Sequence, residues 1–221
     1  MLYLALNKPL QKKRNILLIK ISCLILFTFL ALEINYLNIE FPWDKQILHF
    51  IHSQSSIFLD NFASVATNFG GIKYILSFSF LLCLWLFYQG QKSLLGYLIT
   101  SILSSAIVNF GIKLLFQRPR PNLWESSYPL PSDFSFPSGH AMGSITFALT
   151  LLVIFWGSRY LNFIAILALL YVGLIAWTRL YLGVHYPSDI IGGWLLGIAW
   201  TTLVTLLLNP RSSHSLNEQN T

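Results

Sequence analysis

Long apolar runs alternate with short polar connections along most of the chain. Six runs approach the length that crosses a lipid bilayer, since one helical span needs about 20 apolar residues. They are apolar on every side, which is typical of helices in lipid. The six runs are Ile16–Leu32, Ile72–Tyr88, Ser93–Phe116, Ala141–Trp156, Leu161–Trp177 and Ile190–Leu208. The pattern therefore predicts an all-α fold, a bundle of six transmembrane helices.

The stretch between the first two runs, from Asp44 to Phe69, has a different pattern of apolar and polar residues. Its apolar residues recur at three- and four-residue spacing, which predicts an amphipathic helix or helix pair on the membrane surface. These residues are Ile47, Phe50, Ile51, Phe58, Phe62, Val65 and Phe69. Such a segment would cover the bundle, and a role as a lipid gate is the alternative.

The composition supports a membrane protein of one domain. The chain has 221 residues, of which 55% are hydrophobic and 10% charged, whereas an ordinary soluble domain is about 25% charged. We expect residues 1–208 to form a single membrane domain and residues 209–221 to form a polar tail. Cys23 and Cys83 lie inside apolar runs, which indicates free thiols.

The distribution of Lys and Arg predicts the orientation. With the N-terminus in the cytoplasm, eight of these residues lie inside and six outside, or three if Lys113, Arg120 and Arg179 are set aside for chemistry. This bias predicts cytoplasmic termini and an extracytoplasmic site, in the plasma membrane. The net charge of +6 then reflects cytoplasmic loops, and we expect no nucleic-acid partner. An N-terminal signal peptide is the alternative for the first run.

Charged residues are costly inside a membrane, so their clustering is informative. One cluster runs from Lys113 to Pro121, and a second is Pro137-Ser138-Gly139-His140. A third runs from Thr178 to Asp189. The first two share one loop, and two further crossings separate them from the third. We therefore expect all three clusters on the same face of the membrane.

The cations of these clusters suit phosphate. Arg120 and Arg179 each present a planar fork that matches phosphate oxygens, and Lys113 adds a point charge. The helices that begin at the second and third clusters present free N–H groups and a positive dipole end to an anion. Gly139 allows close approach of the backbone, and Ser138 can donate a hydroxyl hydrogen bond.

Two histidines supply groups for phosphoryl transfer. One must attack phosphorus as a neutral imidazole, while the other holds a proton for the leaving oxygen. Asp189 lies four residues beyond His185 and can accept a hydrogen bond from its second ring nitrogen, which fixes the tautomer. Pro187 and Asp189 also predict the first turn of the last helix. Spacing alone does not tell whether His140 or His185 is the nucleophile.

A metal centre is disfavoured. Metal-dependent phosphatases surround two ions with several carboxylates or histidines, but the carboxylates near the clusters are Glu125, Asp133 and Asp189. We interpret Glu125 and Asp133 as solvated loop charges. The sequence therefore predicts no metal and no other cofactor, with positive side chains in place of the ion.

The order of the motifs carries a family resemblance. Lys-x6-Arg-Pro, Pro-Ser-Gly-His and Arg-x5-His-x3-Asp together resemble the type 2 phosphatidic acid phosphatase superfamily, which also includes vanadium haloperoxidases and glucose-6-phosphatase. The resemblance covers the core from about Lys113 to Asp189. The family's third motif commonly begins Ser-Arg, whereas here it is Thr178-Arg179, which keeps the hydroxyl.

The resemblance implies a role for each motif residue and an activity for the whole. The activity is metal-independent hydrolysis of a lipid phosphate or diphosphate through a phosphohistidine, with a phosphorylated lipid and membrane lipids as partners. The implied roles are nucleophile for His185, general acid for His140, orienting partner for Asp189, and phosphate binding for Lys113, Arg120, Ser138, Gly139 and Arg179.

The sequence leaves several alternatives open. The same phosphohistidine could pass its phosphate to an acceptor lipid, which would make the protein a phosphotransferase. A non-catalytic lipid-binding or transport relative is a second possibility, and a vanadate peroxidase is disfavoured by the six apolar runs. The basic run Arg118–Pro121 could also serve as an interfacial anchor. The sequence specifies neither the lipid nor the oligomeric state.

Overall fold

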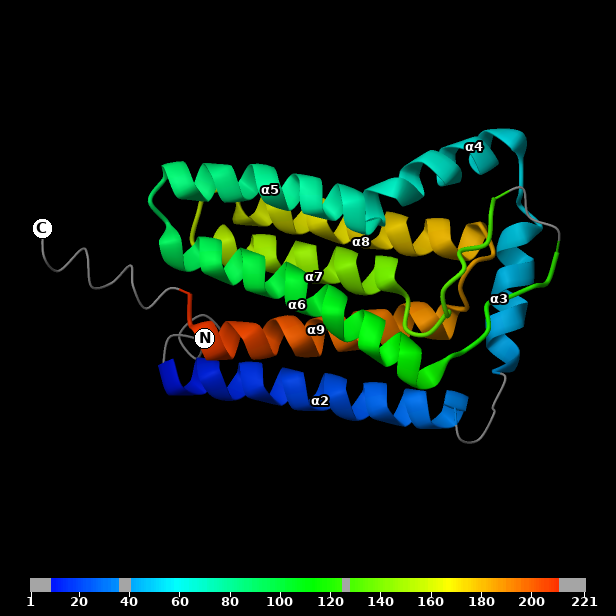
Figure 1. Cartoon of the computed structure of the whole chain (residues 1–221), viewed down its shortest axis with the longest axis horizontal. Coiled ribbons are helices and arrows are strands. Elements are labelled where there is room, and N and C mark those ends of the chain that lie inside the picture. The colour runs from blue at the N-terminus through cyan, green and yellow to red at the C-terminus, as the bar shows by residue number, and fades with distance from the viewer. Residues whose placement is uncertain (1–8, 36–40, 125–127, 211–221) are drawn as a thin grey trace, which may run out of the picture.

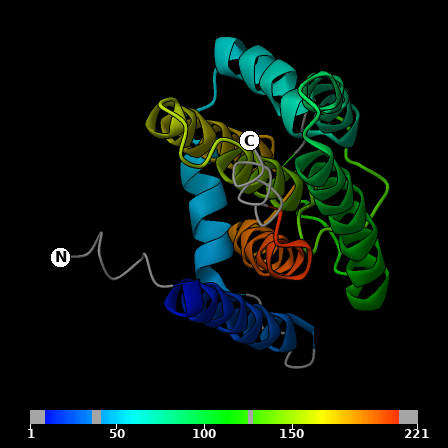
Figure 2. The ribbon, with the colours of Figure 1, turned by 90° about the vertical axis from the view of Figure 1, so that its left-hand side faces the viewer.

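The computed structural model describes residues 9–35, 41–124 and 128–210, which contain helices and no strand. Six long helices lie side by side along one axis, and Figures 1 and 2 show the bundle from the side and along its length. The six helices are α2 (Pro9–Asn35), α5 (Ile72–Tyr88), α6 (Lys92–Phe116), α7 (Gly139–Ile154), α8 (Leu161–Tyr181) and α9 (Pro187–Leu208). Each predicted apolar run therefore forms a helix.

Helix α9 lies at the centre of the packing, in contact with α2, α6 and α7. Glycines let it approach α7 closely. A Cβ atom added at Gly193 would lie 2.7 Å from the carbonyl oxygen of Ser138, and one at Gly197 would lie 3.1 Å from that of Met142. Small residues are typical of close helix contacts in membranes. The contact fixes the start of α7 against the start of α9.

Helix α2 covers the other side of α9 and the loop before α7. Phe27 and Phe136 stack with ring centroids 5.7 Å apart, and both pack with Met142 and Leu196 in one buried cluster. Because Phe136 directly precedes the Pro137-Ser138-Gly139-His140 motif, this cluster supports the loop that carries it.

Two shorter helices occupy the stretch between the first two runs. Helix α3 (Pro42–His52) crosses the end of the bundle, and α4 (Ile57–Ala66) leads through the 3₁₀ helix η1 (Thr67–Gly70) into α5. The chain bends by 51° between η1 and α5. A helix pair was predicted here, but its position on a membrane surface stays a prediction.

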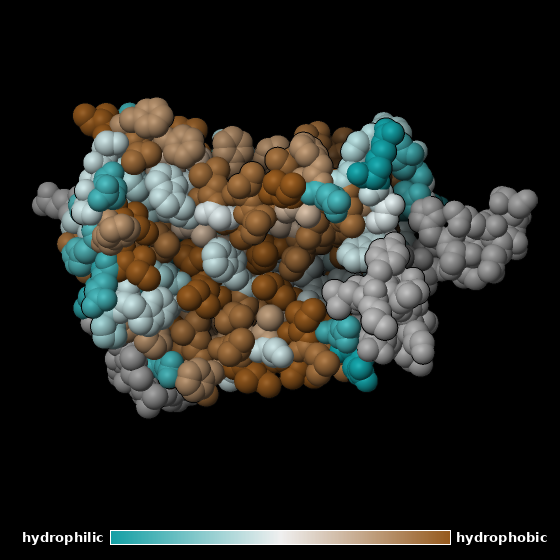
Figure 3. Space-filling view, turned by 180° about the vertical axis from the view of Figure 1, so that it is seen from behind, coloured by the Kyte–Doolittle hydropathy of each residue, from teal (hydrophilic) through white to brown (hydrophobic). Residues whose placement is uncertain are grey.

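By length and composition, the structure has four to five candidate membrane spans within its described residues. Four are residues 14–34 of α2, α6, α8 and α9, and the bent pair of α4–η1 with α5 would add a fifth. Helix α7 is apolar but has 16 residues, fewer than a full span needs. Figure 3 shows a broad hydrophobic belt between more polar ends. The chain is a multi-pass membrane protein, and the sixth span is not shown.

The ends of the helices bring the three motifs together. Helices α6 and α8 end, and α7 and α9 begin, at the end of the bundle where α3 and α4 lie (Figure 1). The three motifs therefore lie at one end of the bundle, which agrees with the count of crossings, whereas the membrane face itself stays a prediction. Of the predicted polar tail, residues 209 and 210 are described and the rest lies outside the described residues, as does Glu125.

Candidate active site

A cavity of about 280 Å³ opens at this end of the bundle. Five of the eight residues predicted for the site line it, together with the carboxylate of Asp133. The five are Lys113, Arg120, Gly139, His140 and Arg179. Ser138, His185 and Asp189 lie behind this lining and connect to it through hydrogen bonds.

Asp133 bridges two of the cations. Its carboxylate oxygens lie 2.7 Å from Lys113 Nζ and 2.5 Å from an Arg120 terminal nitrogen. Partial burial raises the pKa of Asp133, but the ion pairs with Lys113 and Arg120 outweigh this effect and lower the pKa to about 2. The interpretation as a solvated loop charge was therefore incomplete, because the half-exposed carboxylate holds the N–H groups that suit phosphate.

Arg179 is the most deeply buried of the three cations. Its residue is 1% exposed, and one terminal nitrogen donates to Thr67 Oγ1 at 2.7 Å. Its guanidinium lies 5.8 Å from the ring centroid of Tyr128, and its Nε has no hydrogen-bond partner among the described residues. Buried charges need partners, so an anion in the cavity would complete this set of contacts. Nothing in the local sequence had marked Thr67.

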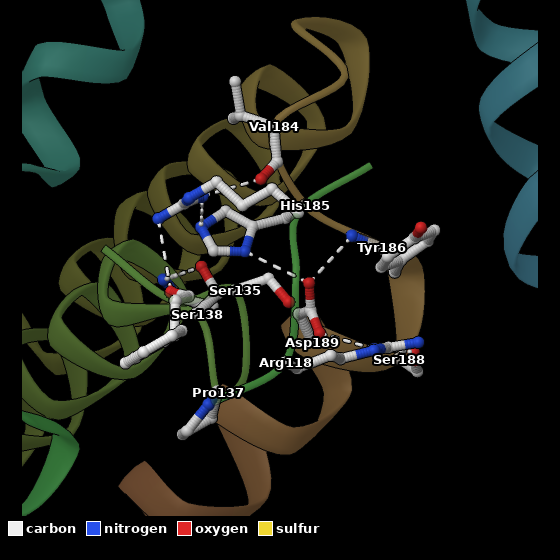
Figure 4. Close-up of polar contacts among 12 residues, drawn as sticks. Arg118, Ser135, Pro137, Ser138, Val184, His185, Tyr186, Ser188 and Asp189 are labelled. Atoms are coloured by element: carbon white, nitrogen blue, oxygen red, sulfur yellow. Dashed lines mark hydrogen bonds and ion pairs between the residues drawn. The ribbon is translucent and has the colours of Figure 1, made fainter. Parts of the chain in front are cut away.

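His185 lies between a cation and a carboxylate. Its Nε2 is 3.0 Å from an Arg120 terminal nitrogen. Its Nδ1 is 3.2 Å from Asp189 Oδ2, and Figure 4 shows this second contact. Because guanidinium only donates hydrogen bonds, Nε2 accepts and Nδ1 carries the proton. Burial, followed by the charges of Arg120 and Arg179, holds the pKa of His185 well below 6.5. The imidazole is thus neutral at pH 7, with a lone pair on Nε2.

Asp189 lies in the first turn of α9, which begins at Pro187 as predicted. Its Oδ2 also accepts from the Tyr186 backbone N–H at 2.9 Å, and its Oδ1 lies 2.5 Å from a terminal nitrogen of Arg118. The sequence had given Arg118 no role beyond an anchor. Arg118 begins the Arg-Pro-Arg-Pro run that also contains Arg120, and this repeat was the sequence signal that could have placed Arg118 at the site.

Helix α7 starts against α9. Ser138 caps it, since its Oγ accepts from Ala141 N at 3.4 Å, and the Ser138 N–H donates to the Asp189 carbonyl at 3.1 Å. A Cβ atom at Gly139 would lie 3.0 Å from Asn109 Oδ1. The absence of a side chain at Gly139 therefore leaves room for Asn109, and phosphate contacts at Ser138 and Gly139 stay predictions.

His140 follows in the first turn of α7 and lies against the junction of η1 and α5, close to Gly70 and Gly71. A Cβ atom at Gly70 would lie 3.2 Å from His140 Cδ2, and one at Gly71 would lie 3.6 Å from its Nε2. The absence of side chains at Gly70 and Gly71 thus leaves room for the imidazole. Neither glycine was among the residues predicted for the site.

Metal-ligating side chains do not gather at this site. Within the described ranges, no group of three or more His, Cys, Asp or Glu side chains is placed to hold a metal ion. The acidic residue Glu125 lies outside those ranges. The expectation of a metal-independent site therefore stays a prediction.

The fold and the site define a helical membrane protein with a cavity that is lined by cations and lies beside two histidines. Residues 94–213 match the sequence profile of the PAP2 superfamily. The match covers more than half of the chain, so the protein belongs to this superfamily, and the resemblance noted in the motifs is confirmed.

Curated relatives carry phosphatase names. An undecaprenyl-diphosphatase of Sulfolobus acidocaldarius is 34% identical over 113 residues, which cover 49% of this chain and 52% of the relative. A putative undecaprenyl-diphosphatase of Escherichia coli is 34% identical over 121 residues, 52% of this chain and 58% of the relative. The chain thus spans just over half the length of these two. A lipid A 4'-phosphatase of Bacteroides thetaiotaomicron is 30% identical and aligns over 70% of this chain and 72% of its own.

Solved structures share the fold. The crystal structure of a PAP2 type phosphatidylglycerolphosphate phosphatase from Bacillus subtilis superposes with a TM-score of 0.72 at 23% identity, over 84% of this chain and 94% of that one. Aquifex aeolicus LpxE superposes with a TM-score of 0.61 at 28% identity, over 75% of this chain and 96% of that one. At 23% identity, the first likeness concerns the fold alone.

Proposed function

We propose that this protein is a metal-independent membrane phosphatase that hydrolyses a lipid phosphate or diphosphate through a phosphohistidine. The observation that carries the proposal is the single cavity lined by Lys113, Arg120, Arg179 and His140. His185 joins it through the 3.0 Å contact between its Nε2 and Arg120. The phosphatase names of the relatives support the same conclusion.

In the first step, the substrate phosphate replaces Asp133 as the partner of Lys113 and Arg120. Arg179 and the N-terminal ends of α7 and α9 add positive potential. Arg120 turns its N–H from His185 Nε2 to the phosphate, which frees the Nε2 lone pair to attack phosphorus in line. The bond from phosphorus to the leaving oxygen breaks as His140 protonates that oxygen.

In the second step, water attacks the phosphohistidine with His140 as general base, which releases phosphate and restores the neutral imidazole. Asp189 stabilises the positive ring of the intermediate. General acid–base catalysis contributes roughly 10²- to 10⁴-fold, whereas phosphate monoesters demand accelerations of up to about 10²¹-fold. Most of the barrier reduction must therefore come from positioning and from the cations.

The cavity wall supports a lipid substrate. Apolar side chains of α5, α6 and α7 continue the lining away from the cations, and pockets of this kind bind apolar groups beside a few polar anchors. They are Ile72, Ile75, Ile102, Ala106 and Met142. We infer that the lipid enters sideways from the outer leaflet with its phosphate between the cations. A lipid diphosphate, phosphatidylglycerophosphate and phosphatidic acid all fit this description.

The same proposal includes the membrane arrangement. We infer six spans, with α7 as a short one, an amphipathic α3–α4 segment at the surface, and cytoplasmic ends for the chain. The site then faces the outside of the plasma membrane, where the predicted bias of Lys and Arg puts it.

Phosphate release from purified protein in detergent tests the function. The panel contains undecaprenyl diphosphate, phosphatidylglycerophosphate, phosphatidic acid and diacylglycerol pyrophosphate. We expect His185→Ala to abolish release and His140→Ala to lose less with good leaving groups. Arg159→Gln, at an exposed loop residue, is the matched control. Normal turnover by His185→Ala would contradict the nucleophile assignment.

Two further measurements separate the alternatives. Strong inhibition by EDTA that added Mg²⁺ reverses would contradict a metal-independent site. Release of free phosphate without an acceptor lipid distinguishes a hydrolase from a phosphotransferase. Lipid transport that persists after replacement of both histidines would favour a transport protein.

A further inference from the structure

The half-buried Arg118 lies two residues before Arg120 but has different partners. Its side chain is 10% exposed, and its terminal nitrogens lie 2.5 Å from Asp189 Oδ1 and 3.1 Å from Asp44 Oδ2. The guanidinium also stacks 4.3 Å from the ring centroid of Tyr186. An interfacial anchor would extend into water or headgroups, so this burial between two carboxylates requires another explanation.

The second carboxylate comes from α3, far away in the sequence. Asp44 is 2% exposed and accepts two hydrogen bonds from Ser188, one from its N–H at 2.9 Å and one from its hydroxyl at 2.5 Å. Because Ser188 lies in the first turn of α9, Asp44 ties α3 to the start of this helix. Arg118 reaches the same hydroxyl at 2.8 Å, which closes the network.

Arg118 also fixes the orientation of the Asp189 carboxylate, that is, which oxygen faces His185. Arg118 binds Oδ1, which leaves Oδ2 to accept from His185 Nδ1 at 3.2 Å and from the Tyr186 N–H at 2.9 Å (Figure 4). The Arg118 backbone is fixed as well, since its carbonyl accepts from Ser135 N at 2.8 Å. Asp189 is fully buried, and a buried carboxylate stays ionised only with a cationic or hydrogen-bonding partner.

We propose that Arg118 is a positioning residue, which keeps the Asp189 carboxylate ionised and turned toward His185. Asp44 is a second positioning residue, because it fixes the other side of the Arg118 guanidinium. The inference rests on the proposed function, since it assumes that His185 attacks phosphorus. Helix α3 thereby becomes part of the active site, although none of its residues line the cavity.

Arg118 and Arg120 lie in one loop but should have different roles. Arg120 lines the cavity and contacts Asp133, so its loss should weaken phosphate binding. Arg118 is not among the cavity residues and acts through Asp189, so its loss should slow the chemical step and leave phosphate binding intact. A difference between kcat and binding therefore distinguishes positioning from a contact with substrate.

The test compares Arg118→Gln, Arg118→Lys and Asp44→Asn with Arg120→Gln and the control Arg159→Gln. The substrate is the panel lipid that wild-type protein hydrolyses fastest. The inhibition constant (Ki) of inorganic phosphate measures the affinity of the cavity for phosphate. We expect Arg118→Gln to lower kcat by about 10- to 100-fold, by analogy with metal-binding histidines, where loss of the outer hydrogen-bond partner has an effect of this size. KM and Ki should change less than about twofold, as expected for an interaction made in the transition state.

Conservative and combined variants test whether the charge of Arg118, its fork geometry and its link to Asp44 each contribute to kcat. Arg118→Lys keeps the charge without the fork and should recover part of kcat. Asp44→Asn is nearly isosteric and should lose kcat less severely than Arg118→Gln. Because both act through one network, the double variant should lose less than the product of the single losses.

Two results would overturn the positioning role. One is wild-type kcat in Arg118→Gln, and the other is a rise in KM and Ki that matches Arg120→Gln. If Arg118→Gln does not fold, Asp44→Asn decides, since lower kcat at unchanged Ki supports the role and unchanged kcat refutes it. Full turnover by His185→Ala refutes the proposed function as well, whereas an inactive His185→Ala beside a fully active Arg118→Gln refutes only the role of Arg118.

Discussion

In the proposed mechanism, Arg120 serves both phosphate binding and the nucleophile. Arg120 contacts Asp133 at 2.5 Å and His185 at 3.0 Å, so it links the two. When phosphate replaces Asp133, Arg120 gains a new acceptor beside His185 Nε2. The proposed mechanism therefore couples phosphate binding to the exposure of the His185 lone pair through the Arg120 guanidinium.

Asp133 leads to a prediction about phosphate affinity. Replacement by Asn removes a carboxylate that competes with phosphate for Lys113 and Arg120. Exposed ion pairs are worth up to about 1 kcal/mol each, so the Ki of inorganic phosphate should fall by roughly 2- to 10-fold. Phosphate inhibition of lipid hydrolysis measures this change, and Asp60→Asn, whose residue contacts Tyr181 instead, is the control.

The pH dependence of this effect follows from the pKa of Asp133. That pKa lies at about 2, below the ordinary 3.8, so the ion pairs are complete above pH 4 and are lost as the pH falls toward 2. The ratio of Ki values between wild type and Asp133→Asn should therefore stay constant from pH 8 to pH 5. Weaker phosphate inhibition in Asp133→Asn would show that Asp133 orders the cations and does not compete.

The residues identified from sequence and those that were missed differ in kind. Lys113, His140 and His185 belong to motifs with fixed spacing, and the structure brings them to one site. Thr67 and Asp44 were missed because their partners lie on distant segments, 112 and 144 positions away. A local pattern carries no information about such pairs.

At the scale of helices, the contact between α7 and α9 decides the geometry of the site. Both helices begin at the cavity end, and Ser138 N donates to the Asp189 carbonyl across the contact. Helix existence was well predicted from the apolar runs, because a long, uniformly apolar run in lipid satisfies its backbone only as a helix. The bend between η1 and α5 had no sequence prediction, although it places Gly70 against His140.

Gly193 tests this contact. In Gly193→Ala the new methyl group would lie 2.7 Å from the Ser138 carbonyl oxygen and 3.0 Å from Ala141 Cβ, so α9 must move away from α7. Overpacking of this kind costs about 1–3 kcal/mol, and we expect a lower unfolding temperature in detergent together with lower kcat.

Gly173→Ala is the matched control, since nothing lies within 4 Å of a Cβ atom at this position of α8. Its unfolding temperature should stay constant or rise, because Ala favours a helix over Gly by about 1 kcal/mol. Equal unfolding temperatures for Gly193→Ala and wild type would contradict the close contact.

At the scale of the whole molecule, an apolar belt separates two polar ends (Figure 3). The site, α3 and α4 lie at one end, and the turn after α5 lies at the other (Figure 1). The belt makes the axis of the bundle the direction across the membrane. Which end faces outward rests on the bias of Lys and Arg.

Cysteine labelling tests this sidedness. In a background with Cys23 and Cys83 replaced by Ser, the variants are Ser53→Cys after α3 and Gln89→Cys after α5, both at exposed residues. A membrane-impermeant maleimide should label Ser53→Cys in intact cells and Gln89→Cys only after permeabilisation. Reversed labelling would put the site in the cytoplasm, and labelling of both in intact cells would contradict a transmembrane bundle.

The all-helical membrane class, the positions of the long helices and the motif residues could all be predicted from the amino-acid sequence. This was possible because hydrophobicity in lipid and the spacing of functional groups are local properties. The folded structure was needed to find that Asp133 bridges Lys113 and Arg120, and that Arg118 joins Asp44 to Asp189. Such pairs depend on which charged groups meet when helices pack, since a buried charge is stable only beside partners that the fold supplies.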